Sequence, residues 1–378
     1  MSIASQDAVY MKQALRLAVK AKGHTSPNPM VGAVIVQNGQ VVGRGYHQQA
    51  GKPHAEVRAL KQAGSKARGA TLYATLEPCC HLSKRTPPCV PALRSFGVKR
   101  VVVAMRDPNP KVQGKGIRQL RQAGIDVVVG CMEQEAKELN RVFSHWIRTG
   151  LPFVILKAAM TLDGKIATAM GESQWITGAA ARRHVHELRS HVDAIMVGIG
   201  TIMKDNPELS VRKGLTSKRS GHARQPTRIV LDSRLRIPPT SKVLRWTLEQ
   251  PTILCTTALA SATKKALLKK THTTVLEFPQ KKDHVSLTAC FQTLGKLGIT
   301  SVLVEGGSEL NAAILHEGLV NQVQFYMAPK VLGGQNAKGL IGGQSPRHLK
   351  HAFSIDNLNV QKIGDDFVWV GHGVHPQQ

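Results

Sequence analysis

Apolar residues in the first 150 positions of the chain repeat with two different spacings. Between residues 7 and 22 they recur at helical spacing, which predicts a helix that Pro27-Asn28-Pro29 ends. Two apolar runs at 31–36 and 41–46 flank Asn38-Gly39, a dipeptide typical of a tight β-hairpin turn. Strands are also predicted at 70–76, 100–105 and 125–129, and helices at 54–63, from about 89 to 96, at 117–123 and at 133–147. This order of elements predicts a mixed sheet covered by helices on both faces.

A second series of elements follows a break at Thr149-Gly150-Leu151-Pro152. Its predicted strands lie at 153–157, 194–198, 227–231, 252–256 and 301–304, and its clearest helices at 179–190 and 309–317. Residues 257–298 can be assigned only coarsely from their pattern. With 378 residues, the chain is long enough to form more than one hydrophobic core. We therefore expect two α/β domains, residues 1–148 and 149–378.

The composition is that of an ordinary α/β protein, with 42% hydrophobic and only 4% aromatic residues. The sequence contains neither a run of about 18 apolar residues nor a basic-then-apolar N-terminus, so we predict no membrane span and no signal peptide. Six cysteines in a chain of this length are far from a disulfide framework. Together these features predict a cytoplasmic protein without a membrane partner.

The chain is strongly basic, with 51 Lys and Arg against 24 Asp and Glu and a formal net charge of +27. Such a balance invites a nucleic-acid partner. The basic residues are nevertheless spread along the chain, and aromatic residues that stack on bases are scarce. A solvated surface that also binds phosphorylated small molecules is the simpler interpretation, so we predict no dedicated nucleic-acid site.

One group of motifs carries recognisable metal chemistry. His54 and Glu56 are two residues apart, Cys79 comes after a further 22 residues, and Cys89 follows after another nine. One imidazole and two thiolates fill three positions of a tetrahedral zinc site and leave the fourth position for water. A Glu that is close but is not a ligand can carry protons while the metal activates that water, as in zinc-dependent nucleobase deaminases. The alternative is a purely structural zinc site with a fourth protein ligand.

The second half of the chain offers a phosphate-binding turn in place of a dinucleotide fingerprint. No Gly-x-Gly-x-x-Gly opens a βαβ unit, and Gly198-Ile199-Gly200 alone is as consistent with a glycine turn after a strand. Glu305-Gly306-Gly307-Ser308 follows a predicted strand and starts a helix, whose N–H groups can bind a phosphate. Arg189 and Arg212 are candidate partners for another phosphate. A tight turn without a ligand and solvated arginines are the alternatives.

Motifs spread through the chain resemble those of the bifunctional riboflavin-biosynthesis deaminase/reductase family. They occur in order from the first helix to about residue 334, near the spacing of the family. In the first half they are Pro27-Asn28-Pro29-Met30-Val31-Gly32, His54-Ala55-Glu56-Val57, Thr75-Leu76-Glu77-Pro78-Cys79, Thr86-Pro87-Pro88-Cys89 and Arg106-Asp107-Pro108-Asn109-Pro110. In the second half they are Leu162-Asp163-Gly164-Lys165, Gly171-Glu172-Ser173-Gln174-Trp175-Ile176-Thr177, Asp205-Asn206-Pro207-Glu208-Leu209 and Ala328-Pro329-Lys330-Val331-Leu332-Gly333.

The resemblance implies two domains and two reactions. The N-terminal domain would be a three-layer cytidine-deaminase-like domain with a mixed sheet, which uses zinc to deaminate 2,5-diamino-6-ribosylamino-4(3H)-pyrimidinone 5′-phosphate. The C-terminal domain would be a dihydrofolate-reductase-like α/β domain, which uses NADPH to reduce the ribosyl side chain and gives 5-amino-6-ribitylamino-uracil 5′-phosphate. That fold binds its nicotinamide cofactor without the Rossmann fingerprint, which explains why none is found here.

The resemblance also implies the site residues, position by position. His54, Cys79 and Cys89 would hold zinc, Glu56 would carry protons, and Lys157 and Asp205 would be the catalytic candidates of the reductase. The implied substrate contacts are Asn28, His47, His81 and Arg85 in the deaminase, and Ser173, Arg189, Leu209, Arg212 and Glu305 in the reductase. The implied cofactor contacts are Ala159, Trp175, Thr201, Asp205, Ser233, Gly307, Ser308, Glu309, Leu310, Asn311, Ala312 and Ala313. Each has a structural alternative, such as a core role for Trp175 or a turn role for Asp205 before Asn206-Pro207.

The metal loop departs from the family pattern in two ways. Cys80 stands where the family has Ser, and Ser83-Lys84 stand where one Gly is expected. The departure puts the assignment of Arg85 in doubt and leaves Cys80 as an alternative ligand. We favour Cys79, because the predicted strand before Glu77-Pro78 anchors it while the insertion can bulge into solvent.

Other functions remain to be weighed at this point. The rival enzyme is a tRNA or free-base zinc deaminase with an unrelated C-terminal domain, although such enzymes place their cysteines as Cys-x-x-Cys. A zinc-stabilised RNA-binding module is the non-enzymatic alternative, and it gives Glu56 no role. A degenerate reductase half is disfavoured by the presence of Lys157, Asp205 and Glu305. The sequence leaves open whether the protein is a homo-oligomer.

Overall fold

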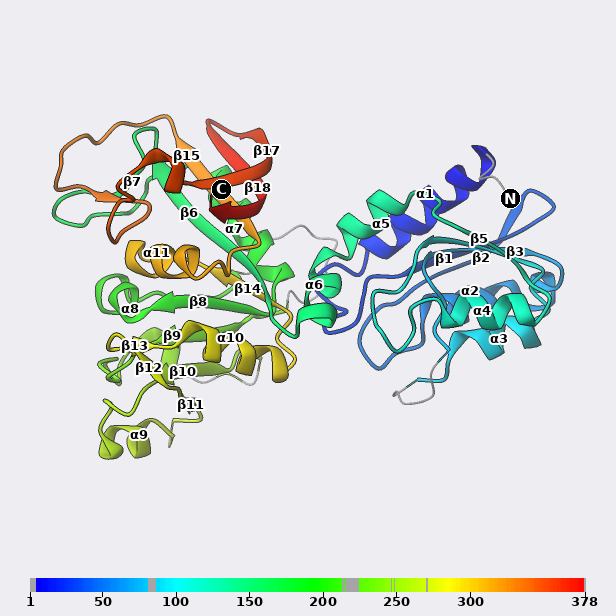
Figure 1. The fold of residues 1–378 in the computed structure, drawn as a ribbon, viewed down its shortest axis with the longest axis horizontal. Coiled ribbons are helices and arrows are strands. Elements are labelled where there is room, and N and C mark those ends of the chain that lie inside the picture. The colour runs from blue at the N-terminus through cyan, green and yellow to red at the C-terminus, as the bar shows by residue number, and fades with distance from the viewer. Residues whose placement is uncertain are drawn as a thin grey trace. The chain divides into compact units, whose positions relative to one another are not determined.

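The computed structural model describes residues 5–80, 86–212, 214, 224–245, 247, 249–269 and 271–376. The chain divides into two compact units, Met1–Gly150 and Leu151–Gln378, which are each described by themselves (Figure 1). Within the described residues, no helix combines the length and the apolar character needed to cross a membrane.

The N-terminal unit is built on a five-stranded mixed sheet in the order β2-β1-β3-β4-β5. The strands are β1 (Gly32–Gln37), β2 (Gln40–Tyr46), β3 (Thr71–Leu76), β4 (Arg100–Met105) and β5 (Asp126–Val129). β1 runs antiparallel to β2 and β3, whereas β3, β4 and β5 are parallel. The hairpin predicted at Asn38-Gly39 is confirmed: both residues have positive φ, 50° and 76°, as a tight hairpin turn requires. The predicted mixed sheet is likewise confirmed.

Helices cover both faces of this sheet, as the order of elements predicts (Figure 1). One face carries α1 (Ser5–Val19) and α5 (Glu133–Leu139), and the other carries α2 (Ala55–Ala63), α3 (Cys89–Ser95) and α4 (Lys115–Gln122). A short 3₁₀ turn, Gly64–Ala67, follows α2. The core between the layers is almost wholly aliphatic, with Leu60, Leu72 and Leu93 among its fully buried side chains.

The single helix predicted at 133–147 is wrong, because the structure has two helices there, α5 and α6 (Arg141–Thr149). They meet at Asn140, whose backbone leaves helical geometry at φ −105° and ψ 21°. The side chain of this buried residue binds Met30 twice: its oxygen accepts from the Met30 N–H at 2.8 Å, and its amide donates to the Met30 carbonyl at 3.0 Å. A long-range contact of this kind overrides the local helical pattern.

Two glycines let α2 lie directly on β2. A Cβ atom at Gly43 would collide with the carbonyl oxygen of Ala59, and one at Gly45 with that of Ala55. The missing side chains therefore set how closely the helix backbone approaches the strand. Because His54 and Glu56 lie at the start of α2, this close packing also fixes the position of the predicted zinc site.

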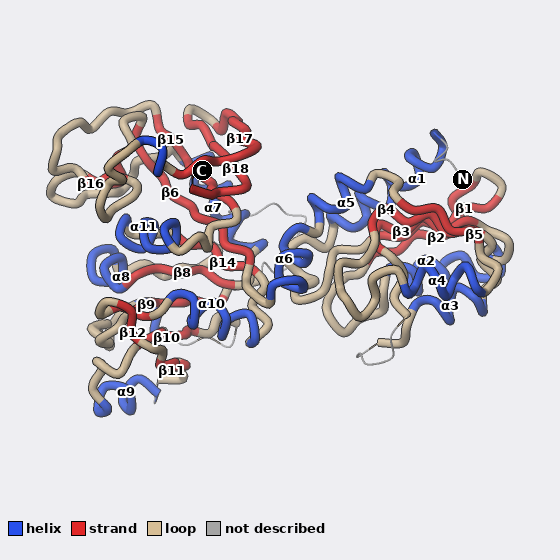
Figure 2. Tube along the Cα trace, in the orientation of Figure 1, coloured by secondary structure: helices blue, strands red, loops and turns tan. Residues whose placement is uncertain are grey.

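The C-terminal unit is built on a nine-stranded sheet in the order β11-β10-β9-β8-β14-β6-β15-β18-β17 (Figure 2). The strands are β6 (Phe153–Thr161), β8 (Ala194–Gly198), β9 (Thr227–Leu231), β10 (Thr252–Thr256), β11 (Thr274–Glu277), β14 (Ser301–Val304), β15 (Gln322–Ala328), β17 (Phe353–Ile363) and β18 (Asp366–Pro376). The seven strands from β11 to β15 are parallel, and β18 and β17 add an antiparallel edge. The strands β8, β10 and β14 are buried over nearly their whole length, as parallel strands covered on both faces are.

Helices and short hairpins complete this unit. The helices are α7 (Ala179–His191), α8 (Ile199–Asp205), α9 (Ala262–Lys269), α10 (Leu287–Lys296) and α11 (Ser308–His316), with 3₁₀ turns at Lys242–Leu244 and Leu349–His351. Two small pairs, β7 (Lys165–Ala167) with β16 (Lys338–Gly339) and β12 (Gln280–Lys281) with β13 (His284–Val285), lie outside the main sheet. The coarsely assigned segment 257–298 thus contains α9, β11, β12, β13 and α10. The sequence pattern did not predict β7, β15, β16, β17 and β18.

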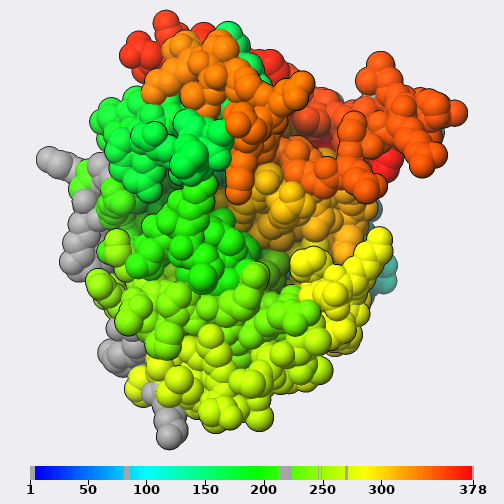
Figure 3. All heavy atoms as spheres, turned by 90° about the vertical axis from the view of Figure 1, so that its left-hand side faces the viewer, coloured from blue at the N-terminus to red at the C-terminus, as the bar shows by residue number. Residues whose placement is uncertain are grey.

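The carboxyl ends of β8 and β14 lie at one edge of this sheet, where α8 and α11 begin. Open α/β sheets bind ligands at such an edge. The antiparallel pair of β7 and β16 joins two distant parts of the chain at this edge, and Figure 3 shows these green and orange segments side by side.

Candidate active sites

The three predicted zinc ligands meet in the N-terminal unit. His54 precedes α2, Cys79 follows β3, and Cys89 is the first residue of α3. His54 Nδ1 lies 3.3 Å from Cys89 Sγ and 3.4 Å from Cys79 Sγ, and the three ligand atoms lie within 4.8 Å of one another. The backbone N–H of Cys89 donates to the Cys79 carbonyl at 3.0 Å, which ties the two ends of the loop together.

This donor set fits zinc. A tetrahedral ion with bonds of about 2.0–2.3 Å places neighbouring ligand atoms about 3.5 Å apart. The two N···S distances, 3.3 and 3.4 Å, are close to that value. One nitrogen and two sulfurs match the ligands that zinc prefers, and three protein ligands leave one coordination position for a small molecule.

Thr86 orients the imidazole of His54. Its Oγ1 lies 2.9 Å from His54 Nε2, on the opposite side of the ring from the two sulfur atoms. With zinc on Nδ1, that nitrogen would carry no proton, so Nε2 would carry the ring proton and donate it to the Thr86 hydroxyl. Such an outer hydrogen bond fixes both the tautomer and the ring orientation of a metal ligand.

Glu56 lies in the first turn of α2 and is 3% exposed. Burial, and next the negative charge of Cys79, raise the pKa of its carboxyl group. Glu56 has no ion pair among the residues that the structure describes. The carboxylate lines the same cavity as His54 and Cys79, so it can act on a molecule bound there. Glu56 is not one of the three candidate metal ligands.

The cavity over the metal group has a volume of about 420 Å³. Asn28 and His47, both predicted substrate contacts, line it and are joined by a 3.0 Å hydrogen bond from Asn28 Nδ2 to His47 Nε2. His47 Nδ1 lies 3.4 Å from the Pro53 carbonyl, and burial lowers the pKa of the His47 side chain. His81 and Arg85, the other two predicted contacts, lie outside the described residues.

Several residues of this site were not assigned from the sequence. Thr86, Asp107, Asn109 and Phe143 also line the cavity. Asp107 and Asn109 follow the carboxyl end of β4, next to that of β3, so the rule that ligands bind at strand ends could have found them. No local signal marks Phe143, which lies on α6, 54 positions beyond Cys89.

Glu77 anchors the strand end that carries Cys79. This buried carboxylate accepts backbone N–H groups from Asp107 at 3.2 Å, Gly114 at 2.9 Å and Ile117 at 3.2 Å. The last two N–H groups lie at the start of α4, where a negative charge is favoured. Glu77 therefore holds the loop after β4 and the start of α4 against the loop that carries Cys79, a candidate metal ligand.

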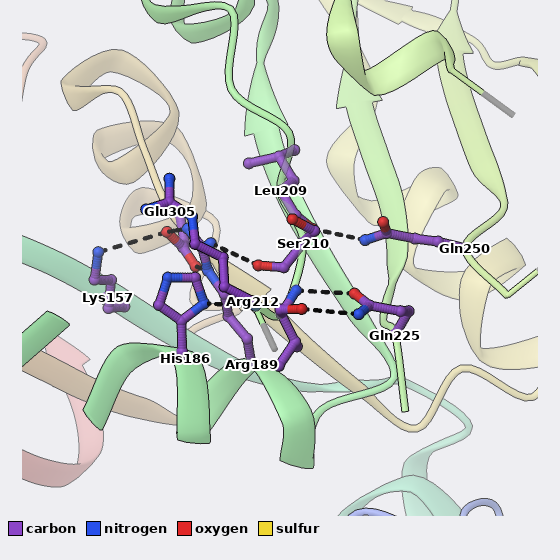
Figure 4. A network of polar contacts seen from close by, with 10 residues as sticks. Lys157, His186, Arg189, Leu209, Ser210, Arg212, Gln225, Gln250 and Glu305 are labelled. Carbon is purple, nitrogen blue, oxygen red and sulfur yellow. Dashed lines mark hydrogen bonds and ion pairs between the residues drawn. The ribbon is translucent and has the colours of Figure 1, made fainter. Parts of the chain in front are cut away.

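In the C-terminal unit, the predicted residues Lys157, Arg189 and Glu305 form one ion-pair cluster (Figure 4). Arg189 binds Glu305 with two parallel hydrogen bonds of 2.7 and 2.8 Å, and Lys157 Nζ lies 3.5 Å from Glu305 Oε2. Lys157 comes from β6, Arg189 from α7, and Glu305 directly follows β14. Burial alone would raise the pKa of Glu305, but the charges of Arg189 and Lys157 outweigh it and lower the pKa to about 2.

Leu209 and Arg212, two further predicted substrate contacts, belong to a segment that is attached to this cluster. Leu209 is buried and has a positive φ of 51°, whereas Arg212 is exposed. Ser173 is half-buried in the loop between β7 and α7. Asp205 is the last residue of α8, where burial raises its pKa and the nearby charges of Lys204 and Lys338 oppose the rise.

Most of the predicted cofactor residues lie at the starts of α8 and α11. A Cβ on Gly307 would contact Thr201 Oγ1 at 3.7 Å, so these two positions are adjacent. Asn311 is buried; its amide donates to the Leu340 carbonyl at 3.0 Å, and its oxygen has no hydrogen-bond partner among the described residues. Ala159 is half-buried on β6, and the Ser233 hydroxyl accepts the Val285 N–H at 3.2 Å. The other predicted positions, Ser308, Glu309, Leu310, Ala312 and Ala313, lie in the first turns of α11.

Trp175 is not a core residue, which was its structural alternative. It is 55% exposed, and the guanidinium of Arg182 lies 4.6 Å from its ring centroid. An exposed aromatic face at this edge of the sheet is suited to stacking on a planar ligand.

The two units match two family models. Residues 4–105 match the cytidine and deoxycytidylate deaminase zinc-binding region, and residues 152–369 match the RibD C-terminal domain. The chain is also similar over nearly its full length to whole proteins. It is 45% identical to the riboflavin biosynthesis protein RibD of Aquifex aeolicus over 96% of this chain and 97% of that protein.

Solved structures agree with this assignment. Acinetobacter baumannii RibD, form 2, superimposes with a TM-score of 0.86 at 39% identity, covering 98% of this chain and 99% of that one. A diaminohydroxyphosphoribosylaminopyrimidine deaminase/5-amino-6-(5-phosphoribosylamino)uracil reductase from Thermotoga maritima superimposes with a TM-score of 0.81 at 33% identity, covering 97% and 98% of the two chains. The fold and the two sites therefore define a zinc deaminase domain joined to a reductase domain. The chain belongs to the family of the riboflavin biosynthesis protein RibD.

Family membership decides between the functions weighed from the sequence. The protein is a bifunctional deaminase and reductase of riboflavin biosynthesis, with a zinc-binding deaminase domain and a reductase domain that uses NADPH. The alternative of a tRNA or free-base deaminase with an unrelated C-terminal domain is not supported, because the second half matches the RibD C-terminal domain.

Proposed function

We propose that the two domains, 1–148 and 149–378, act in sequence on one phosphorylated pyrimidine. The Thermotoga relative is named as a deaminase of a diaminohydroxyphosphoribosylaminopyrimidine and a reductase of 5-amino-6-(5-phosphoribosylamino)uracil. We assign the same two substrates to this chain. The first domain then exchanges a ring amino group for oxygen, and the second reduces the ribosyl side chain of that product to ribityl.

For the deamination, we assign zinc to His54, Cys79 and Cys89. Zinc, when bound there, supplies a Lewis acid that makes water nucleophilic near neutral pH. Hydrolysis consumes one water and releases ammonia, so one water proton must reach the departing amino group. Glu56 is suited to carry it, because its carboxylate lines the cavity and is engaged in no ion pair among the described residues. Asn28 and His47 would hold the pyrimidine, together with His81 and Arg85.

For the reduction, the protein must hold the sugar phosphate and supply one proton. NADPH, when bound, supplies the hydride. Lys157 is our candidate proton donor, because its ammonium faces Glu305 at 3.5 Å. Asp205 is the second candidate. Glu305 and Ser173 would bind the substrate beside the proton donor.

Arg212 is our candidate for the substrate phosphate. The guanidinium of Arg189 already donates to Glu305 and to a backbone carbonyl, whereas Arg212 is exposed. A charge-assisted contact from Arg212 would contribute about 1.5–3 kcal/mol to binding. Arg189 and Leu209 would complete this side of the substrate site.

We assign NADPH to the edge of the sheet where α8 and α11 begin. Thr201, Ser233 and the stretch Gly307–Ala313 would contact its phosphates and sugars, and Ala159 and Trp175 its nicotinamide end. The start of α11 offers N–H groups for a phosphate. The thiolate ligands need a reducing compartment, so we place the protein in the cytoplasm.

The convergence of His54, Cys79 and Cys89 beside a buried Glu56 is the observation that carries this proposal. It is tested by incubating the full chain with the diaminopyrimidine substrate. We expect ammonia release without NADPH, and one NADPH oxidised per ammonia when it is added. A zinc chelator should stop ammonia release yet leave NADPH oxidation on the deaminated substrate intact. Ammonia release that survives complete zinc removal would contradict the proposal.

A further inference from the structure

Residues 209–212 belong to no helix or strand, yet the backbone of each is held by a side chain from another part of the C-terminal unit (Figure 4). These four residues are called the 209–212 segment below. Gln250 donates to the Leu209 carbonyl at 2.7 Å, and Arg189 donates to the Ser210 carbonyl at 3.0 Å. The segment therefore depends on tertiary contacts for its conformation.

Gln225 makes the most complete of these contacts. Its side-chain oxygen accepts the N–H of Val211 at 2.8 Å, and its amide donates to the Val211 carbonyl at 2.9 Å. A residue paired with a neighbouring antiparallel β-strand forms one hydrogen bond through its N–H and one through its carbonyl. The single side chain of Gln225 makes both of these bonds to Val211. Val211 is 3% exposed, so these backbone groups have little access to water and need protein partners.

His186 holds the last residue of the segment. Its Nδ1 lies 3.3 Å from the backbone nitrogen of Arg212, so it accepts that N–H. His186 and Arg189 are three residues apart on α7 and therefore point from the same face of the helix. This face of α7 holds the segment at Ser210 and at Arg212.

Arg189 also fixes where the 209–212 segment lies relative to Glu305 and Lys157, its partners in the ion-pair cluster. The same guanidinium that donates to Ser210 makes two hydrogen bonds to Glu305, which in turn faces Lys157. The backbone that carries the exposed Arg212 side chain is therefore positioned against Glu305 and Lys157 by direct hydrogen bonds.

We propose that Gln225 and His186 are positioning residues of the reductase, which hold the 209–212 segment so that Arg212 meets the phosphate of the substrate. The inference rests on the proposed function, in which Arg212 makes that contact. It adds two residues that touch neither substrate nor cofactor and that act on substrate affinity through the backbone of Val211 and Arg212.

The first test replaces Gln225 by Met in the full chain, which removes both hydrogen bonds at similar side-chain length. The KM for 5-amino-6-(5-phosphoribosylamino)uracil should rise about tenfold, equivalent to 1.4 kcal/mol. The kcat and the KM for NADPH should stay within about twofold, and the dephosphorylated substrate should be reduced equally well by Gln225→Met and wild type. Gln361→Met, the same change at an exposed position of β17, is the matched control and should change none of these values.

The second test compares two variants of His186, one that keeps and one that lacks an acceptor for the backbone N–H of Arg212. Asn carries its Oδ1 near the place of the His Nδ1, so His186→Asn should keep the KM close to the wild-type value. His186→Leu fills similar space without an acceptor and should raise the KM about tenfold, since a tenfold change corresponds to one lost hydrogen bond of ordinary strength. Equal KM values for the two variants would overturn the role of His186.

Arg212→Ala separates failure of this inference from failure of the proposed function. If Arg212→Ala leaves the KM of the phosphorylated substrate unchanged, the phosphate contact itself is wrong. If Arg212→Ala raises that KM but Gln225→Met and His186→Leu do not, the positioning role alone is wrong. A Gln225→Met chain that loses kcat, NADPH affinity and thermal stability together would also overturn the inference, because Gln225 would then be a general structural residue.

Discussion

Glu56 in the N-terminal unit and Glu305 in the C-terminal unit are both buried carboxylates in a predicted active site, but their partners differ. Glu56 has no ion pair among the described residues, and burial raises its pKa. Glu305 is bracketed by Arg189 and Lys157, which hold its pKa at about 2 despite burial. A carboxylate without a cation can exchange protons, whereas one held by two cations is a fixed negative charge.

The contrast matches the two reactions. Hydrolytic deamination has to move a proton from water to a leaving amino group, and a carboxylate free of ion pairs suits that task. In the proposed reduction, a substrate and the cationic Lys157 have to be held in fixed relative positions, and a permanent anion is suited to hold them. The following predictions test whether the two halves are as different as their glutamates indicate.

The largest expected effect on activity comes from changing one of the candidate zinc ligands His54, Cys79 and Cys89. Cys79→Ser should abolish zinc binding and ammonia release, because only Cys79 and Cys89 are found with His54 within ligand distance in the described structure. Cys80→Ser, the adjacent control, should keep both. Metal analysis of the purified variants checks this directly, and zinc loss in the Cys80 variant would mean that the ligand register is shifted by one residue.

Glu305→Gln should damage the other half. It leaves Arg189 and Lys157 without their counter-charge in a largely buried cluster, a loss that costs about 3–5 kcal/mol in such sites. We expect NADPH oxidation to fall to background and the C-terminal unit to unfold at lower denaturant concentration. Ammonia release should stay at the wild-type rate. A parallel fall in both activities would show that the two halves are not chemically separate.

A smaller effect is expected at Thr86, which orients His54. Thr86→Val removes the hydroxyl that binds His54 Nε2 and should weaken zinc binding about 10–100-fold, as loss of such an outer partner typically does. Thr86→Ser keeps the hydroxyl and should bind zinc nearly as tightly as wild type. Competition with a metal-sensitive dye measures both affinities. Equal affinities for the Val and Ser variants would exclude the proposed hydrogen bond.

The smallest effect is a pH dependence from His186. Burial, then the charges of Arg189 and Arg212, lower the pKa of His186 to about 4. The unfolded chain protonates this residue near pH 6.5, whereas the folded chain does so only near pH 4. Its contribution to stability is therefore complete above pH 6.5 and is lost as the pH falls towards 4, a change on the order of 1–3 kcal/mol. Denaturant titrations at pH 7 and pH 5 should show a smaller loss for His186→Asn than for wild type; parallel losses would contradict the prediction.

The sequence pattern correctly predicted elements that depend mainly on neighbouring residues, namely the buried strands and the first hairpin. The strands at 194–198, 227–231, 252–256 and 301–304 were predicted with the bounds that the structure has, because strands buried on both faces are continuous apolar runs. The hairpin at Asn38-Gly39 depends on two adjacent residues. The strands at 322–328, 353–363 and 366–376 were missed. Of these, β17 is largely exposed and gives a weak apolar pattern.

Residues whose roles depend on distant partners could not be found in this way. The break at Asn140 comes from a contact with Met30, 110 positions away. The sequence could bring His54, Cys79 and Cys89 together as candidate metal ligands because they form a compact motif. Glu77 and Gln225 instead bind backbone groups that only the fold brings near. Sequence motifs thus identified the candidate reactive residues, and the structure was needed to find the residues that hold them in position.

The most direct test of the central claim, that one chain carries two separate chemistries with Glu56 serving only the first, is a kinetic assay of full-length Glu56→Gln. With NADPH and the diaminopyrimidine substrate, this variant should retain zinc but release ammonia at least about 10²-fold more slowly than wild type, and NADPH oxidation should be equally slow. With the deaminated substrate, it should oxidise NADPH at the wild-type rate. Rapid NADPH oxidation on the diaminopyrimidine, or a slow rate on the deaminated substrate, would contradict the claim.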